Sequence, residues 1–323
     1  MRLATVPARP HGLDVLPVGA LRRCAQHAIK GRRALEEPRA KTHLICDTNV
    51  FRYLGNGRLS EADILKPEET VCYTAIAAVE LGSHIEKDFQ AKKRACMAIR
   101  DLSARQLPDP DSFVAGALDL ELAEASEDWS DVIEIIAKAD SEEELTETGI
   151  RYPDGSRRWL DARYADRFRR NAEGPYIDAL LRLASDEIPD LASWRAQRTG
   201  HPPKLKGDQK TRFLQLVGSR EWWVTAVSIE WERVRSVAKA APLRPPTDAA
   251  SLVVFLCPCA IYTQYLRDVL VAGRQVESND FGDLRLFDYS VSDNHIIVTA
   301  EKKWSRIAKA AGFSERVRIV TPA

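Results

Sequence analysis

Two kinds of hydrophobic pattern alternate along the chain. Apolar residues recur every three or four positions in some stretches, as they do at Val224, Val227, Trp231 and Val234. Short apolar runs of strand length occupy residues 43–46, 70–74, 295–299 and 316–320. The spaced residues predict helices with one apolar face, and the short runs predict buried strands. Together the two patterns predict an α/β fold with a parallel sheet flanked by helices.

The strand-like runs lie only near the two ends of the chain. Residues 86–248 between them show helical spacing, which ends in a long apolar stripe at 219–241. The prolines that follow this stripe mark the return to strand-forming sequence. We therefore expect a split α/β domain, formed by 41–85 and 249–323, with an all-helical insertion at 86–248. Residues 1–40 form an N-terminal extension whose basic run predicts a helix.

Composition narrows the class of protein. The chain has 323 residues, of which 45% are hydrophobic and 29% charged, and its 47 basic side chains balance 47 acidic ones. Because the net charge is zero, any surface that binds nucleic acid must be local. The six cysteines lie mostly in apolar stretches, so we expect reduced thiols in a cytoplasmic protein. We expect no membrane span, since no apolar run reaches about 18 residues and no signal peptide is present.

Acidic residues follow or adjoin the predicted strands. Asp47 comes directly after the first strand, and Glu80 lies about two turns into the helix that follows the second. Glu301 comes just after the strand at 295–299. Functional groups in open α/β sheets lie just beyond the carboxyl ends of the strands, so we expect these acids to meet at one edge.

Two more acids open the helix before the strand at 295–299. Asn279 can cap this helix, and Asp280 and Asp283 lie on one face of its first turn. From Asp283 the helix climbs about 12 Å to Val291. A strand of five residues then runs back about 16 Å, which brings Glu301 near both aspartates.

In this order the motifs resemble those of the PIN-domain nucleases. The matching stretches are Asp47-Thr-Asn49, Val79-Glu80-Leu-Gly82, Asn279-Asp280-x-x-Asp283 and Val298-Thr299-x-Glu301. The resemblance covers residues 41–85 and 250–323. It implies a PIN-like, Rossmann-type sheet and an acidic site that binds Mg²⁺ or Mn²⁺ and hydrolyses phosphodiester bonds, usually in RNA. The chain departs from the family in its long insertion and in Glu301, where the family more often has Asp.

The chemistry of such a site assigns a role to each acid. Two divalent ions about 3.5–4 Å apart can activate water and neutralise a phosphate, and carboxylates hold them. Mg²⁺ and Mn²⁺ prefer oxygen ligands, which fits a site without His or Cys. We assign Asp47, Asp283 and Glu301 as metal ligands. Glu80 is a further ligand or orients the attacking water.

Three other residues complete the predicted site. Asp280 is expected at its rim, where it binds a second metal ion directly or through water. Asn49 and Thr299 are expected to form hydrogen bonds with the carboxylates or with the substrate phosphate. The hypothesis requires that Asp47, Glu80, Asp283 and Glu301 converge.

Each acid also has a purely structural interpretation. Asp47 could cap a helix, and Asp280 and Asp283 could interact with a helix dipole. Glu80 and Glu301 could simply face solvent. Taken together, such coincidences at one sheet edge are less favoured than a single site.

Two rival functions remain open. The first is a PIN-like module that no longer catalyses and that binds nucleic acid or protein. The second is a phosphatase, although that class usually has another acid two residues after its nucleophilic Asp, where this chain has Asn49.

The partner hypotheses concern the insertion. The arginine-rich stretch 151–170 could follow the phosphates of RNA, or it could be a solvated helix face. A protein partner or inhibitor could dock on residues 86–248. Nothing in the pattern indicates the oligomeric state.

Overall fold

The computed structural model describes most of the chain outside its N-terminal extension. The described residues are 41–83, 85–124, 128–148, 150–151, 157–158, 180–185, 188, 191, 204–277 and 280–323. The predicted basic helix within 1–40, the proposed cap Asn279 and most of the arginine-rich stretch 151–170 lie outside the described residues.

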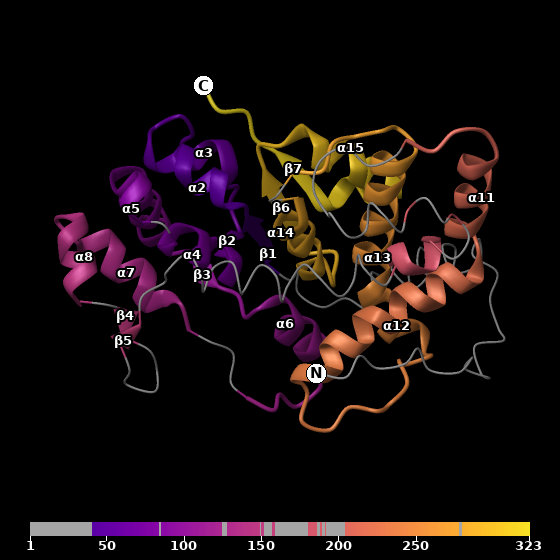
Figure 1. Cartoon of the computed structure of the whole chain (residues 1–323). Helices are drawn as coiled ribbons and strands as arrows, with labels where there is room; N and C mark the ends of the chain where they lie inside the picture. Colours follow the sequence, from indigo (N-terminus) through magenta and orange to yellow (C-terminus); the bar gives the residue numbers. More distant parts are fainter. Residues whose placement is uncertain are drawn as a thin grey trace.

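Among the described residues, a sheet of five parallel strands forms the centre of the fold (Figure 1). Its order is β3-β2-β1-β6-β7. The strands are β1 (Thr42–Cys46), β2 (Glu69–Tyr73), β3 (Arg105–Gln106), β6 (His295–Thr299) and β7 (Val317–Ile319). Helices flank this sheet, so the predicted α/β class is confirmed.

The strands read as continuous apolar runs because both faces of the sheet are covered. In β1, Leu44 and Cys46 belong to one cluster of core residues, and Ile45 between them belongs to another. Val298 and Ile297 of β6 divide between the two clusters in the same way. This alternation is the two-residue period of a strand, with each face packed against its own helices.

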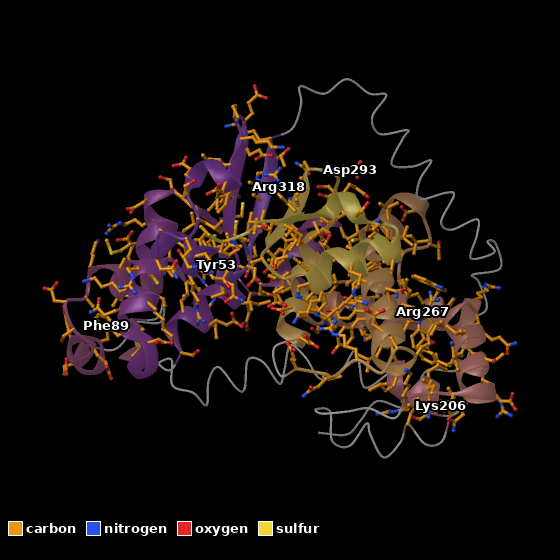
Figure 2. All side chains as sticks on the ribbon, turned by 90° about the horizontal axis from the view of Figure 1, so that it is seen from above. Tyr53, Phe89, Lys206, Arg267, Asp293 and Arg318 are labelled. Carbon is orange, nitrogen blue, oxygen red and sulfur yellow. The ribbon has the colours of Figure 1, made fainter. Side chains whose placement is uncertain are left out.

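Different helices cover the two faces. The cluster that contains Leu44 includes residues of α2 (Thr48–Gly55), α4 (Ala75–Gly82), α5 (Ile85–Asp101) and α7 (Ser130–Lys138). The cluster that contains Ile45 includes residues of α6 (Pro110–Ala117), α11 (Gly207–Val217), α12 (Arg220–Val237), α13 (Ala249–Leu270) and α15 (Lys302–Ala311). In Figure 2, Tyr53 and Phe89 accordingly lie toward one end of the molecule, and Arg267 and Lys206 toward the other.

The expectation of an all-helical segment at 86–248 is wrong. Strand β3 lies within it and joins the edge of the main sheet, where it pairs with β2. Two further short strands, β4 (Ile150–Arg151) and β5 (Arg157–Arg158), pair antiparallel. These strands have two residues each, which is too short for an alternating pattern to appear in the sequence.

Both hydrophobic clusters combine residues from 86–248 with residues from the flanking parts of the chain. Helices α5 and α7, for example, pack in the same cluster as α2, although only α2 lies in the predicted split domain. In the described part, residues of the predicted domain and of the predicted insertion therefore pack in the same hydrophobic clusters. The two segments are distinct in sequence and do not have separate cores.

The helix that carries the predicted aspartates ends earlier than expected. Helix α14 (Asp280–Arg285) passes into a 3₁₀ turn, η1 (Leu286–Tyr289), two residues short of Val291. The remaining short elements are α3 (Glu61–Ile64), α8 (Glu142–Thr148) and η2 (Ser314–Arg316). Together η1 and the turn after it reverse the chain into β6.

Helix α13 is the most apolar long helix of the described part. Its segment Ser251–Leu270 is, by length and composition alone, apolar enough to cross a membrane, with a mean hydropathy of 1.2. Here 67% of that segment is buried inside the protein, where it packs against α12 and α15. Its apolar character is therefore accounted for by core packing.

A buried ionic network joins α6, α12, α14 and η1, and we call it the arginine network. Its members are Asp111, Glu230, Arg233, Arg285 and Asp288. Arg233 lies 3.0 Å from Glu230, 3.1 Å from Asp111 and 3.4 Å from Asp288. Arg285 lies 2.6 Å from Asp288 and 2.9 Å from Asp111. The network thus links segments 86–248 and 249–323 beneath the surface.

Candidate active site

The carboxyl ends of the central strands bring the predicted acids to one edge of the sheet. β1 pairs in parallel with both β2 and β6, so the three chains leave the sheet in the same direction. Each then turns directly into a helix: α2 begins after Asp47, α4 after Thr74 and α15 after Glu301. In the order β3-β2-β1-β6-β7, the chain builds outward from β1 to β3 on one side and from β6 to β7 on the other. The direction of the connections therefore changes between β1 and β6. Such a switch point is where open α/β sheets form their crevices.

Asp47 lies at this switch point and is 4% exposed. One carboxylate oxygen, Oδ1, accepts a hydrogen bond from the backbone N–H of Asn49 at 3.2 Å, which caps α2. The other oxygen, Oδ2, accepts a hydrogen bond from the Thr299 hydroxyl at 3.0 Å. The capping interpretation of Asp47 is therefore correct, and the same side chain also reaches the end of β6. Asn49 contributes through its backbone in this contact.

Glu80 lies near the end of α4 and is partly buried. Its Oε2 accepts a hydrogen bond from the Thr48 hydroxyl at 2.6 Å, which ties α4 to the start of α2. Thr48 was not among the predicted residues, although it directly follows Asp47. It fixes the direction of the Glu80 carboxylate.

Asp283 and Glu301 approach the same place from the other side of the switch point. Burial raises the pKa of Asp283 well above its usual value, and the charges of Asp47, Glu301 and Glu80 raise it further. Burial likewise raises the pKa of Asp47 to about 6, with Glu80 and Glu301 adding to the effect. Direct contacts connect three of these acids: Thr299 donates to Asp47 and accepts from the Glu301 backbone, and the Lys303 ammonium lies beside both Glu301 and Asp283. We call Asp47, Glu80, Asp283 and Glu301 the acidic site.

The expectation that Asp280 lies at the rim is wrong, because its side chain is fully buried. Its Oδ2 accepts hydrogen bonds from the Tyr265 hydroxyl at 2.9 Å and from the Glu277 backbone at 3.2 Å. Its Oδ1 lies 2.8 Å from the Lys303 ammonium and 3.2 Å from Arg274. Each oxygen already has at least two donors, which occupies the lone pairs of the carboxylate. Asp280 thus anchors the neighbouring side chains.

Lys303 is the residue that the sequence interpretation missed. Its ammonium lies 2.6 Å from Glu301 and 3.6 Å from Asp283, in addition to its contact with Asp280. Burial opposes its charge, but hydrogen bonds to Asp280 and Glu301 raise the pKa of Lys303 above its ordinary value. One signal was present in the sequence. Lys303 falls in the first turn of α15, where the helix dipole disfavours a cation unless an acid lies nearby.

Aromatic side chains position the aspartate of the acidic site that lies on α14. The Trp304 indole N–H donates a hydrogen bond to Asp283 Oδ2 at 3.2 Å. Trp304 is itself buried and stacks on Tyr265 with ring centroids 6.1 Å apart. The orientation of Asp283 is therefore set by a rigid, packed ring.

The donor set suits a hard divalent cation. The acidic site offers carboxylate oxygens. The hydroxyl groups of Thr48 and Thr299 fix the orientation of the Glu80 and Asp47 carboxylates. Burial first, and the charges of neighbouring carboxylates second, raise the pKa of Asp47 and of Asp283. Within the described residues no group of three or more His, Cys, Asp or Glu side chains is already arranged as a metal-binding shell. The oxygen donors of the acidic site would suit Mg²⁺ or Mn²⁺.

Comparison with known proteins indicates neither a family nor a function for this chain. No family model, no curated protein and no solved structure matches the chain. Its function has to be argued from the geometry and chemistry of the acidic site.

Proposed function

We propose that the protein is a metal-dependent endonuclease of the PIN type, which hydrolyses phosphodiester bonds in RNA. The supporting observation is that acids from four separate elements gather at the switch point of a parallel sheet, where burial first and neighbouring carboxylates second raise the pKa of Asp47 and of Asp283. The order of the motifs along the chain supports a PIN-like form of that sheet. We also propose a cytoplasmic location, because the cysteines of the described residues are free thiols.

The chemistry follows from the positions of the four acids. Bound Mg²⁺ or Mn²⁺ supplies an activated water, neutralises the scissile phosphate and supports the leaving oxygen. Asp47, Asp283 and Glu301 provide oxygen ligands for the cation. Glu80 provides a further oxygen or orients the attacking water.

Neighbouring groups keep these carboxylates in place while the substrate binds. Thr299 donates to Asp47, Thr48 donates to Glu80, and Trp304 donates to Asp283. Because each bond fixes the orientation of a ligand before the cation arrives, less reorganisation is needed during the reaction.

A cleavage assay with the full chain tests the proposal. Structured RNA, single-stranded RNA and single-stranded DNA are each incubated with Mn²⁺, with Mg²⁺ or with EDTA. We expect RNA cleavage that requires a divalent ion and that is lost in the Asp283→Asn variant. Activity that persists in EDTA, or that survives the substitution, would remove the acidic site from the mechanism.

One observation favours a second function, a PIN-like binding module that does not catalyse. The Lys303 ammonium already forms ion pairs with Glu301, Asp283 and Asp280, and so compensates part of the charge. Such a module binds RNA or protein equally well in Mn²⁺ and in EDTA and cleaves neither RNA nor DNA. The same assay, with binding measured beside cleavage, separates the two functions.

A further inference from the structure

Helix α15 carries a stripe of positive charge that begins beside the acidic site. The helix starts directly after Glu301 and contains four basic residues and no acidic one, although the whole chain has no net charge. Lys303 contacts Asp283 and Glu301 of the acidic site. The other three basic side chains are exposed and recur at helical spacing, and they are Lys302, Arg306 and Lys309. At the usual helical rise they form a stripe about 10 Å long on one side of α15.

The neighbouring helix α13, which packs against α15 (Figure 1), adds a fourth basic side chain. Arg306 pairs with Asp268 of α13 at 2.8 Å, and Gln264 donates a hydrogen bond to the same aspartate at 3.0 Å. Gln264 in turn accepts a hydrogen bond from Arg267 at 3.4 Å. These contacts place the exposed Arg267 on the same surface as Arg306. We call the four exposed basic residues the basic face: Arg267, Lys302, Arg306 and Lys309.

Little negative charge compensates the basic face. Arg306 has an ion-pair partner in Asp268, whose side chain is 11% exposed. Within the described part of the chain, Arg267, Lys302 and Lys309 form no ion pair. The first turn of α8, at the far end of the molecule in Figure 1, carries three glutamates instead. A polyanion is therefore attracted to the basic face and repelled by α8.

The side chains around the basic face favour a phosphate backbone as its partner. Helix α15 turns its apolar residues Trp304 and Ile307 into the core. Among the described residues, the exposed large hydrophobic side chain is Leu243, which lies after α12 and outside the basic face. A helix that binds a membrane needs apolar side chains to insert, and base stacking needs exposed aromatic rings. The basic face offers charge alone, which suits phosphates.

We propose that the basic face binds the phosphate backbone of RNA, independently of base sequence, and leads it to the acidic site. Lys302 directly follows Glu301, so a strand that lies along α15 reaches the acidic site at the first turn of the helix. The inference rests on the proposed function for its substrate.

The test measures how salt weakens RNA binding by the full-length protein. A fluorescein-labelled single-stranded RNA is titrated with protein in EDTA, at KCl concentrations between about 50 and 200 mM, and fluorescence anisotropy gives the affinity. EDTA prevents metal-dependent cleavage during the measurement. The test variant combines Arg267→Gln, Lys302→Gln and Lys309→Gln. Arg306 is kept because Asp268 would otherwise lose its ion-pair partner.

The matched control removes the same number of charges from exposed positions on α5 and α7, at the other end of the molecule (Figure 1). Its substitutions are Arg94→Gln, Arg100→Gln and Lys138→Gln. Because every substituted side chain is exposed, both variants should keep the melting temperature of the wild-type protein.

The expected result follows from counterion release. Each phosphate contact contributes about 0.7 to the slope of log affinity against log salt for a single strand, so the test variant should flatten the slope by about 2. Its affinity at about 50 mM KCl should fall about 10-fold or more, and equally for two RNAs of different base composition. The control should keep the wild-type slope. An unchanged slope in the test variant, or an equal change in the control, would overturn the inference.

A second measurement needs no variant. Bound RNA should protect Lys302 and Lys309 of the wild-type protein from acetylation by acetic anhydride, read by mass spectrometry, while Lys138 stays reactive. Equal modification with and without RNA would contradict the proposal. So would binding of the wild-type protein to phosphatidylserine vesicles but not to RNA.

Cleavage in Mn²⁺ separates this inference from the function on which it rests. If the wild-type protein cleaves RNA and the test variant keeps the wild-type salt slope, the basic face loses its role and the endonuclease stands. If the slope flattens but the wild-type protein does not cleave RNA, the basic face stands and the proposed endonuclease fails.

Discussion

The acidic site and the arginine network are both groups of buried and partly buried carboxylates, and they differ in their positively charged partners. In the arginine network, Asp111, Glu230 and Asp288 face two guanidinium groups within 2.6–3.4 Å. Burial raises the pKa of Glu230 well above its usual value, although Arg233 opposes the shift. Burial also raises the pKa of Asp288 to about 7 and the pKa of Asp111 above its usual value, and Arg233 opposes both shifts.

The acidic site has different partners. The Lys303 ammonium lies beside Asp283 and Glu301, and Arg274 pairs with the separate Asp280. The comparison teaches that burial of acids alone does not identify a functional site. An acid cluster that is paired with arginines holds segments of the fold together, whereas the acidic site gathers at the switch point of the sheet.

The largest change in stability is expected in the arginine network. Arg233→Met should lower the free energy of unfolding by about 3–5 kcal/mol, because Glu230 and Asp288 stay buried and lose the guanidinium that pairs with them. The gain in melting temperature on addition of Mn²⁺ should be unchanged. Chemical denaturation, with and without Mn²⁺, measures both quantities.

Arg235→Met is the matched control for this prediction. Arg235 lies on the same helix and pairs with Glu232 at 2.6 Å, but both side chains are largely accessible to solvent. Its loss should cost less than about 1 kcal/mol. Equal destabilisation by the two substitutions would contradict the view that the arginine network stabilises the core.

Asp283→Asn tests the acidic site. Cleavage should fall about 100- to 1,000-fold, equivalent to about 3–4 kcal/mol of transition-state stabilisation, because a strong ligand is lost. The stability of the metal-free protein should hold or rise, since one repelling charge is removed while the amide oxygen can still accept the Trp304 hydrogen bond. Single-turnover cleavage and thermal melts in EDTA and in Mn²⁺ provide the two readouts.

Asp288→Asn makes the same chemical change in the arginine network and serves as its counterpart. It should destabilise the protein in the absence of metal and leave the Mn²⁺-dependent stabilisation intact. If the two substitutions gave the same pattern, the distinction between the acidic site and the arginine network would fail.

The pH dependence of stability sharpens the comparison further. Burial, with repulsion from Glu80, raises the pKa of Asp47 from 3.8 in the unfolded chain to about 6 in the folded protein. Between these values the folded state binds more protons than the unfolded state, so stability falls as pH rises from about 4 to about 6. For the metal-free protein this term is about 2–3 kcal/mol. Denaturation curves between about pH 4 and pH 7 should show a steeper decline for wild type than for Asp47→Asn, whereas parallel curves would rule the effect out.

The smallest effect concerns a hydroxyl group. Thr299→Val removes the hydrogen bond to Asp47 Oδ2, so Asp47 loses its fixed orientation. We expect cleavage to fall about 10-fold, as is typical for a group that orients a metal ligand, and stability to fall by about 1 kcal/mol. Thr299→Ser, which keeps the hydroxyl and loses the methyl group, should retain most of the cleavage rate. If Thr299→Ser were as slow as Thr299→Val, the methyl group and not the hydroxyl would be responsible.

The parts of the structure that were predictable are those with a strong local signal. The strand at 295–299 and the first strand, Thr42–Cys46, were found within one residue because buried parallel strands are continuous apolar runs. The placement of Asp47 and Glu301 at one sheet edge followed from general rules for parallel sheets. Strand β3 was missed because its two residues carry no periodic signal.

The parts that were not predictable depend on contacts between distant segments. Spacing placed Asp280 beside Asp283 on one helical face, but it gave no indication that Tyr265 and Arg274 would surround Asp280. The distinction between Lys302 and Lys303 likewise depends on how α15 is turned against α14. Sequence therefore identified the acids, and only the packing of α13, α14 and α15 revealed which of them already have partners.

The central strand β1 has its two neighbours at very different distances along the chain. It pairs with β2, some two dozen residues away, and with β6, whose Val298 lies beside Cys46. During synthesis at about 5–20 residues per second, Asp47 therefore leaves the ribosome roughly 10–50 s before Thr299, its hydrogen-bond partner, exists. In that interval the edge of β1 is open to pairing with other chains. The acidic site can assemble only after Glu301 has been synthesised, so a nascent or truncated chain that stops before Glu301 carries an exposed strand and no complete site.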